Sequence, residues 1–162
     1  MKLFLNVFAL LLSIIFYTQS LAQAPNLQAV DNVLSQFHSS AAKADWDTYF
    51  QLMSADAIFM GTDATERWTK NEFEQYARKT NGWTYYLRER HINFTPDGNS
   101  AWFDELLWNE KLGLCRGSGV LIKSKDNKAS GEQWLLSQYN LTIPIPNDAV
   151  SKVIPIIGAK KL

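Results

Sequence analysis

The chain of 162 residues has only one cysteine, Cys115, and two histidines, His38 and His91. A single cysteine excludes a disulfide within the chain, so a packed core must stabilise the fold. There is no Cys/His cluster and no His-x-x-x-His pair, so we expect neither a metal nor an organic cofactor. An excess of charge of one sign is also missing, because 16 Lys and Arg balance 16 Asp and Glu. This balance gives no electrostatic case for a nucleic acid or an anionic membrane as a partner.

The N-terminus has the pattern of an export signal. Lys2 supplies a positive charge, residues 3–17 are almost wholly apolar, and small residues occupy positions −3 and −1 of a cleavage site after Ala22. The alternative is an uncleaved membrane anchor, but an apolar run of about 15 residues is shorter than the ~20 that span a bilayer. We therefore predict a cleaved signal peptide over residues 1–22. The secreted or periplasmic product, residues 23–162, is expected to be a single domain without stable membrane association.

Helical periodicity precedes strand periodicity along the rest of the chain. Apolar residues at three- and four-residue steps between Leu27 and Ala41 predict an amphipathic helix. Asp45 is an N-cap for a short second helix, and Thr69 with Glu72 forms a capping box for a third. The predicted strands are a short one over residues 56–61 and four long ones over 83–94, 101–109, 114–124 and 133–143. This order predicts an α+β fold in which a bent antiparallel sheet wraps around the helices and leaves a cavity at its open end.

The order of the elements, together with several short segments, resembles the SnoaL-like branch of the nuclear transport factor 2-like (NTF2-like) superfamily. The segments that carry the resemblance are residues 44–47 (ADWD), 56–62 (DAIFMGT), 66–68 (ERW), 88–91 (RERH), 101–105 (AWFDE), 115–120 (CRGSGV) and 138–142 (QYNLT). The resemblance implies a cone of N-terminal helices packed in a strongly curved antiparallel sheet. Related cones include isomerases, dehydratases, cyclases and epoxide hydrolases, as well as ligand-binding and dimeric members. The fold therefore does not choose the function.

His91 is the first candidate for a catalytic residue. It lies on a predicted strand with Glu89 on the same face, and a neutral imidazole beside a carboxylate transfers protons near pH 7. The alternative is a sheet histidine with no chemical role. Asp104 is the second candidate, because a carboxyl in an aromatic-lined pocket has a raised pKa and serves as general acid or base. Adjacent strand residues point to opposite faces, so Asp104 and Glu105 cannot both face the cavity.

Five further side chains are candidates for binding a ligand: Trp68, Trp102, Glu105, Arg116 and Tyr139. The two tryptophans are expected to line an apolar site or, alternatively, to belong to the core or a dimer interface. Arg116 is the expected cross-strand partner of one of the two neighbouring carboxylates, as a structural pair or within a site. Tyr139 offers its hydroxyl to a bound polar group or lies at the edge of the core.

Two other features are predicted to have no chemical role. Gly117 and Gly119 flank Ser118 within a strand, where glycines mark a bend or a close approach by another group. Their spacing fits neither a phosphate-binding loop nor a nucleophile elbow. His38, on the first helix, is expected at the surface or in helix packing.

Three functions remain open, and we favour the first. It is the binding of a small, partly apolar molecule in the cavity, oriented by His91, Arg116 and one of the carboxylates Asp104 and Glu105. The alternative is a cofactor-independent acid–base enzyme of the isomerase, dehydratase or cyclase type that uses the same pocket. The third is an interaction protein that pairs as a homodimer through the sheet face. The sequence names neither the ligand nor the strand face that lines the cavity, because a single β-bulge inverts that face.

Overall fold

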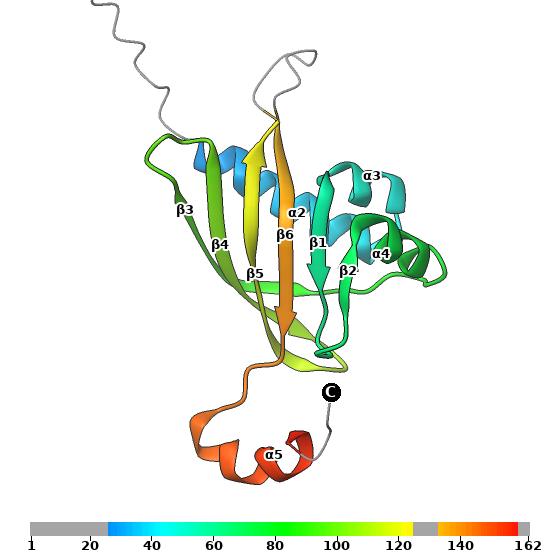
Figure 1. Cartoon of the computed structure of the whole chain (residues 1–162), viewed down its shortest axis with the longest axis vertical. Coiled ribbons are helices and arrows are strands. Elements are labelled where there is room, and N and C mark those ends of the chain that lie inside the picture. The colour runs from blue at the N-terminus through cyan, green and yellow to red at the C-terminus, as the bar shows by residue number, and fades with distance from the viewer. Residues whose placement is uncertain (1–25, 125–132, 159–162) are drawn as a thin grey trace, which may run out of the picture.

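The computed structural model describes residues 26–124 and 133–158, so the predicted signal peptide and the cleavage site after Ala22 lie outside the described residues. Its elements are α2 (Leu27–Ala42), α3 (Trp46–Gln51), β1 (Met53–Met60), β2 (Arg67–Thr69), α4 (Lys70–Ala77), β3 (Tyr86–Phe94), β4 (Ser100–Asn109), β5 (Gly113–Lys123), β6 (Trp134–Thr142), η1 (Asn147–Ala149) and α5 (Val150–Ile157). Three helices thus precede the four long strands, which confirms the predicted α+β order (Figure 1). None of the helices in the described ranges has the length and apolar character needed to cross a bilayer.

Side-chain caps determine where the helices begin. Asn26 and Asp45 each accept a hydrogen bond from the backbone N–H three residues later, at 3.2 Å, and so cap α2 and α3. At the start of α4 the side chains of Thr69 and Glu72 each accept the other residue's backbone N–H, which confirms the predicted capping box. Such caps satisfy backbone donors that have no partner within the helix.

The six strands form one sheet in the order β2-β1-β6-β5-β4-β3. The four long strands make the predicted antiparallel meander, and β2 pairs antiparallel with β1. The pair of β1 and β6 is parallel, because the chain crosses over through α4 and the other three long strands before β6 returns beside β1. The sheet curves around the helices, with α2 lying across its concave face (Figure 1).

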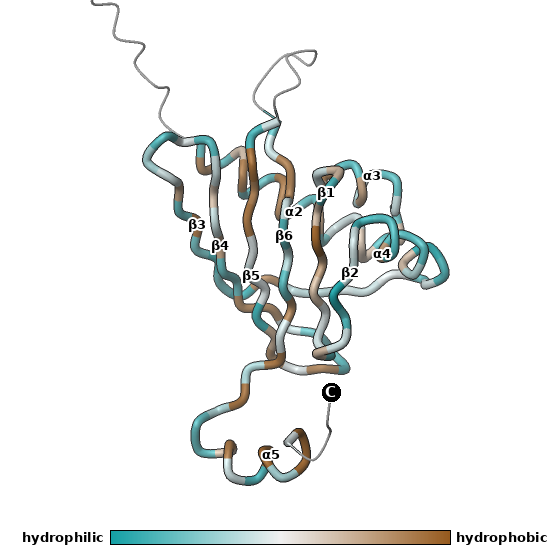
Figure 2. Tube along the Cα trace, in the orientation of Figure 1, coloured by the Kyte–Doolittle hydropathy of each residue, from teal (hydrophilic) through white to brown (hydrophobic). Residues whose placement is uncertain are grey.

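The two faces of the sheet differ in burial and in hydropathy. Along β4 the buried residues alternate with exposed or half-buried ones, and Figure 2 shows the matching alternation of apolar and hydrophilic positions along the strands. The buried residues of β4 are Ala101, Phe103, Glu105 and Leu107. They face the apolar stripe of α2, which consists of Val30, Leu34, Phe37 and Ala41. The core therefore lies between the concave face and the helices, as the helical periodicity predicted.

The C-terminal segment extends away from the open end of the cone (Figure 1). Its helix α5 packs mainly on η1 and contains several hydrophobic residues (Figure 2). Ile156 is 72% exposed, and Val150, Ile154 and Ile157 are exposed as well.

Candidate functional site

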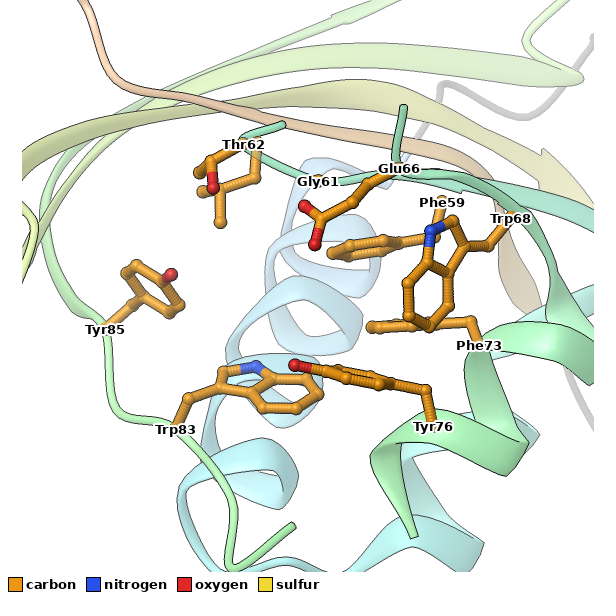
Figure 3. A pocket seen from close by; sticks show the side chains of 10 residues that line it. Phe59, Gly61, Thr62, Glu66, Trp68, Phe73, Tyr76, Trp83 and Tyr85 are labelled. Carbon is orange, nitrogen blue, oxygen red and sulfur yellow. The ribbon is translucent and has the colours of Figure 1, made fainter. Parts of the chain in front are cut away.

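An aromatic cavity of about 150 Å³ lies between the β1–β2 loop, α4 and the segment that leads into β3 (Figure 3). Its lining consists of Phe59, Gly61, Thr62, Glu66, Trp68, Phe73, Tyr76, Trp83, Tyr85 and Leu141. Six of these residues are aromatic, and Glu66 is the one charged residue among them. Tyr76 is 48% exposed, so one wall of the cavity borders solvent.

Local structure brings these side chains together from separate parts of the chain. The β1–β2 loop is closed by the backbone N–H of Gly61, which donates to the carbonyl of Glu66 at 2.9 Å. On α4, Phe73 and Tyr76 are three residues apart and therefore share a helix face. Phe59 of β1 stacks on Phe73 with ring centroids 3.8 Å apart and planes 12° apart. The stacked pair ties α4 to the sheet and forms a rigid apolar surface of the cavity.

Behind this cavity a buried ionic network surrounds Glu105. One carboxylate oxygen, Oε1, accepts hydrogen bonds from Nε2 of His38 at 2.6 Å and from the hydroxyl of Tyr139 at 2.9 Å. The other, Oε2, accepts a hydrogen bond from Nε of Arg90 at 2.8 Å and forms an ion pair with its Nη2 at 2.7 Å. Arg90 also donates through Nη1 to Oδ1 of Asp31 at 2.8 Å. Every oxygen of this buried carboxylate is therefore paired, which is the condition for burying a charge.

The network keeps Glu105 ionised. Burial alone raises the pKa of Glu105, but the hydrogen bond and charge of His38, together with Arg90, bring that pKa below its ordinary value. The pKa of Tyr139 lies well above its ordinary value because the hydroxyl is buried and faces Glu105. An ionised carboxylate that is stabilised by this set of donors is a weak proton acceptor. Its effect in the network is to orient the ring of His38. In the described part of the chain, no three His, Cys, Asp or Glu side chains gather as a metal site.

His38 connects the network to two smaller spaces. It lines a groove of about 260 Å³ between α2 and β3, together with Tyr85 and Arg90. It also lines an inner void of about 10 Å³, where the buried hydroxyl of Tyr49 has no hydrogen-bond partner among the described residues. Tyr85 lines the groove, the void and the aromatic cavity alike, whereas His38 lines the first two and is not among the residues that line the cavity. Burial raises the pKa of Tyr85 to about 12, which keeps this hydroxyl neutral.

Three of the seven predicted site residues lie on the inner side of the sheet. Trp68 lines the aromatic cavity, and Glu105 and Tyr139 form a hydrogen bond in the buried network. Asp104 faces outward, so the two neighbouring carboxylates point to opposite faces as predicted.

The other four predicted site residues, His91, Trp102, Asp104 and Arg116, lie on the outer face. The side chain of His91 is 58% exposed and lies 3.2 Å from Asp104 and 3.3 Å from Glu89. The hydrogen bond and charge of Asp104 raise the pKa of His91. Neither residue reaches the cavity or the buried network. Trp102 is exposed on the same face, where the predicted homodimer would pair, and that pairing stays a prediction.

Two expectations about partners were wrong. Arg116 stands opposite Leu106 on the outer face, so the cross-strand partner of Glu105 is Arg90 instead. His38 is neither a surface residue nor only a packing residue, because its side chain is 11% exposed and binds Glu105. A pattern of alternating residues on one strand does not identify a partner that approaches from a helix.

Several cavity residues were not predicted from the sequence, namely Glu66, Phe73, Tyr76 and Tyr85. One signal in the sequence pointed toward two of them. Tyr76 follows Phe73 on the same face of a helix with a clear N-terminal cap. The position of Tyr85 could not be predicted in this way, because the structure has a bulge between Leu87 and Glu89. Leu87 therefore stands opposite the buried Leu107, and Tyr85 and Leu87 do not share the face of His91 as strand alternation would have them.

Comparison with solved structures shows the fold. An NTF2-like protein of unknown function from Pseudomonas putida is 10% identical, with a TM-score of 0.59 over 75% of this chain and 89% of that one. A candidate scytalone dehydratase from Novosphingobium aromaticivorans is also 10% identical, with a TM-score of 0.59 over 73% and 83% of the two chains. A candidate ketosteroid isomerase from Shewanella frigidimarina is 18% identical, with a TM-score of 0.54 over 70% and 94%.

Sequence comparison shows the family. No curated protein sequence matches the chain. The model of the SnoaL-like domain matches residues 30–146, which include every helix and strand of the cone except the first turn of α2. The chain therefore belongs to the SnoaL-like domain family.

Proposed function

We propose that this protein binds a small, partly apolar molecule in the aromatic cavity at the open end of the cone. The observation that carries this proposal is the lining itself, which combines six aromatic residues with the single carboxylate of Glu66. Apolar walls with a few placed polar groups are typical of small-molecule sites. A cavity of about 150 Å³ is comparable to an engineered apolar cavity that accommodates benzene. The expected ligand is therefore of about that size.

Binding is favoured over catalysis because of where the polar groups lie. Two structural relatives are described as a candidate dehydratase and a candidate isomerase, but a shared fold does not transfer an activity. In this chain the acid–base candidate His38 does not line the cavity and borders the inner void instead. The group that a ligand in the cavity meets directly is Glu66, with the rings around it (Figure 3).

The tryptophans provide a direct test of where a ligand binds. We expect small aromatic and alicyclic compounds, screened by NMR, to shift the indole N–H signals of Trp68 and Trp83, which line the cavity. Trp102 and Trp108 are exposed on the outer face and act as internal controls. Their signals should not move at ligand concentrations that saturate the other two. Binders that move only the outer pair, or a broad screen without any binder, would contradict the proposal.

An acid–base enzyme is a second candidate, and the contact of His38 with Glu105 is the observation that favours it. A carboxylate that fixes one ring nitrogen leaves the other available for proton transfer. The imidazole borders both the groove beside α2 and the inner void with the unpartnered Tyr49 hydroxyl. A substrate that entered along the ring of Tyr85 would meet these groups.

Substituting each histidine in turn distinguishes a catalytic His38 from the hypothesis that His91 is the catalytic residue. If a substrate is turned over, we expect His38→Ala to abolish turnover and His91→Ala to retain it, because only the first histidine faces an internal space. Steady-state rates of both variants and of the wild type, with circular dichroism to confirm folding, make the comparison. Full activity of a folded His38→Ala variant would exclude His38 as the acid or base.

A further inference from the structure

The carboxylate of Glu66 stands in the aromatic cavity without a cationic partner. Its Oε2 accepts a hydrogen bond from the backbone N–H of Asp63 at 3.2 Å, and no Lys, Arg or His within residues 26–124 and 133–158 forms an ion pair with it. Gly61 provides the room for this side chain, since a Cβ at that position would lie 2.1 Å from the same oxygen. In Figure 3 the carboxylate points into the space between Trp68, Trp83 and Tyr85. The negative charge is thus directed at the ligand.

The rings around this carboxylate form walls at different angles. The planes of Trp68 and Tyr76 are 84° apart with centroids 4.6 Å apart, so these two rings make adjacent walls. Trp83 lies at 28° to Phe73, with centroids 5.8 Å apart. A box of ring faces attracts a cation through the ring quadrupoles, and quaternary ammonium groups are typically recognised in this way.

The chemistry of the lining selects among possible ligands. An anion is repelled by Glu66, and a neutral molecule leaves the charge of Glu66 uncompensated when it displaces water. A primary ammonium carries three N–H donors that all need acceptors, whereas the lining is mainly ring faces, with the Glu66 carboxylate and the hydroxyls of Thr62, Tyr76 and Tyr85 as its side-chain acceptors. A methylated ammonium has few or no N–H donors to satisfy, and its methyl groups pack against the rings.

We propose that the cavity is a site for a small methylated ammonium compound, with Glu66 as counter-ion and Trp68, Tyr76, Trp83 and Tyr85 as the surrounding rings. This inference rests on the proposed function and names its ligand class. The cavity volume of about 150 Å³ limits the compound to one head group with a short substituent. Tyr76 is the exposed wall, so a longer substituent leaves the site on that side.

A pair of probes with the same shape and different charge tests the inference. Choline and dimethylbutanol, its uncharged carbon analogue, are titrated separately into the purified protein by calorimetry and by the NMR signals of Trp68 and Trp83. We expect choline to bind at least about tenfold more tightly than its analogue. Glu66→Gln should remove most of that preference, because it deletes the charge and retains the shape and an acceptor. Glu89→Gln, which deletes an exposed carboxylate on the outer face, should leave the preference unchanged.

Each outcome decides between this inference and the proposed function. Equal affinity for the two probes, or a preference that survives Glu66→Gln in a folded variant, overturns the ammonium inference and leaves the binding cavity in place. Binding of benzyl alcohol without binding of choline likewise overturns the ammonium inference and leaves the binding cavity in place. Failure of all three probes, together with an empty wider screen, overturns both proposals. Thermal denaturation of each variant shows whether it is folded. Tyr76→Leu, which changes the exposed wall of the cavity, is a second variant that tests the inference. We expect it to lower the affinity for choline about threefold.

Discussion

Replacing Arg90 with methionine is expected to lower the free energy of unfolding by about 3–5 kcal/mol. The side chain is only 4% exposed, donates a hydrogen bond to Glu105 and another to the carboxylate of Asp31, and forms ion pairs with both. Methionine keeps much of the apolar stem but leaves the carboxylate buried with His38 and Tyr139 as its remaining partners. Removing one side of a buried ion pair is costly because the other charge stays desolvated. Urea denaturation, followed by tryptophan fluorescence, measures the change.

Arg88 provides the matched control for this substitution. It lies on the same strand but is exposed, so Arg88→Met should change the free energy of unfolding by no more than about 0.5 kcal/mol. The double variant Arg90→Met/Glu105→Leu should be less destabilised than the sum of the single variants, because the uncompensated charge is gone. If Arg90→Met and Arg88→Met had equal effects, the buried network would not contribute to stability in the way described.

Acid titration gives a second measure of the same network. The folded-state pKa of Glu105 lies below its ordinary value, so its contribution to stability is present at pH values above the unfolded-state pKa. That contribution is lost as the pH falls through the folded-state pKa. The stability difference between wild type and Arg90→Met should therefore shrink in acid, and a difference that grew in acid would contradict this assignment.

Substituting alanine for Gly119 is expected to cost about 3 kcal/mol of stability, at the upper end of overpacking effects. A Cβ on Gly119 would lie 2.0 Å from the backbone carbonyl oxygen of Gln138 on the neighbouring strand β6. A backbone atom in a paired strand cannot move without shifting the sheet, so the clash must be relieved by displacing β6. Thermal or urea denaturation of the variant gives the size of the loss.

The neighbouring positions supply the comparison. A Cβ on Gly117 would lie 2.3 Å from the hydroxyl of Tyr139 and 2.7 Å from Oε1 of Glu105. Both are side-chain atoms that can shift, so Gly117→Ala should cost less, about 1–2 kcal/mol. Ser118 points to the other face, and Ser118→Ala should be nearly neutral. A Gly119→Ala variant as stable as Ser118→Ala would show that β5 and β6 do not approach this closely in solution.

The two glycines connect the stability of the fold to the site. They allow β6 to approach β5 on the inner face, which places the hydroxyl of Tyr139 within 2.9 Å of Glu105. The sequence predicted a bend or a close approach at this point, and the close approach is what the structure shows. The structure adds that the neighbours are a backbone carbonyl and the buried network.

The sequence by itself determined the local features of this protein. The apolar stripe of α2, the cap at Asp45 and the capping box of Thr69 and Glu72 follow from contacts within a few residues. The opposite orientations of Asp104 and Glu105 follow from the two-residue period of a strand. Backbone geometry imposes these periods wherever an element forms, so they can be read without knowledge of the tertiary structure.

Only the tertiary structure decided which side chains meet. Strand alternation was correct for Asp104 and Glu105, but it did not show that His38 from a helix and Arg90 from the edge strand converge on the inner carboxylate. The aromatic cavity likewise combines residues from a loop, a helix, three strands and the approach to a fourth. Contacts between segments far apart in the chain decide which face is buried, where a bulge shifts the register and which loop closes a cavity. Local periodicity carries no information about those contacts, and for this reason the fold was predictable from the sequence while the arrangement of the site was not.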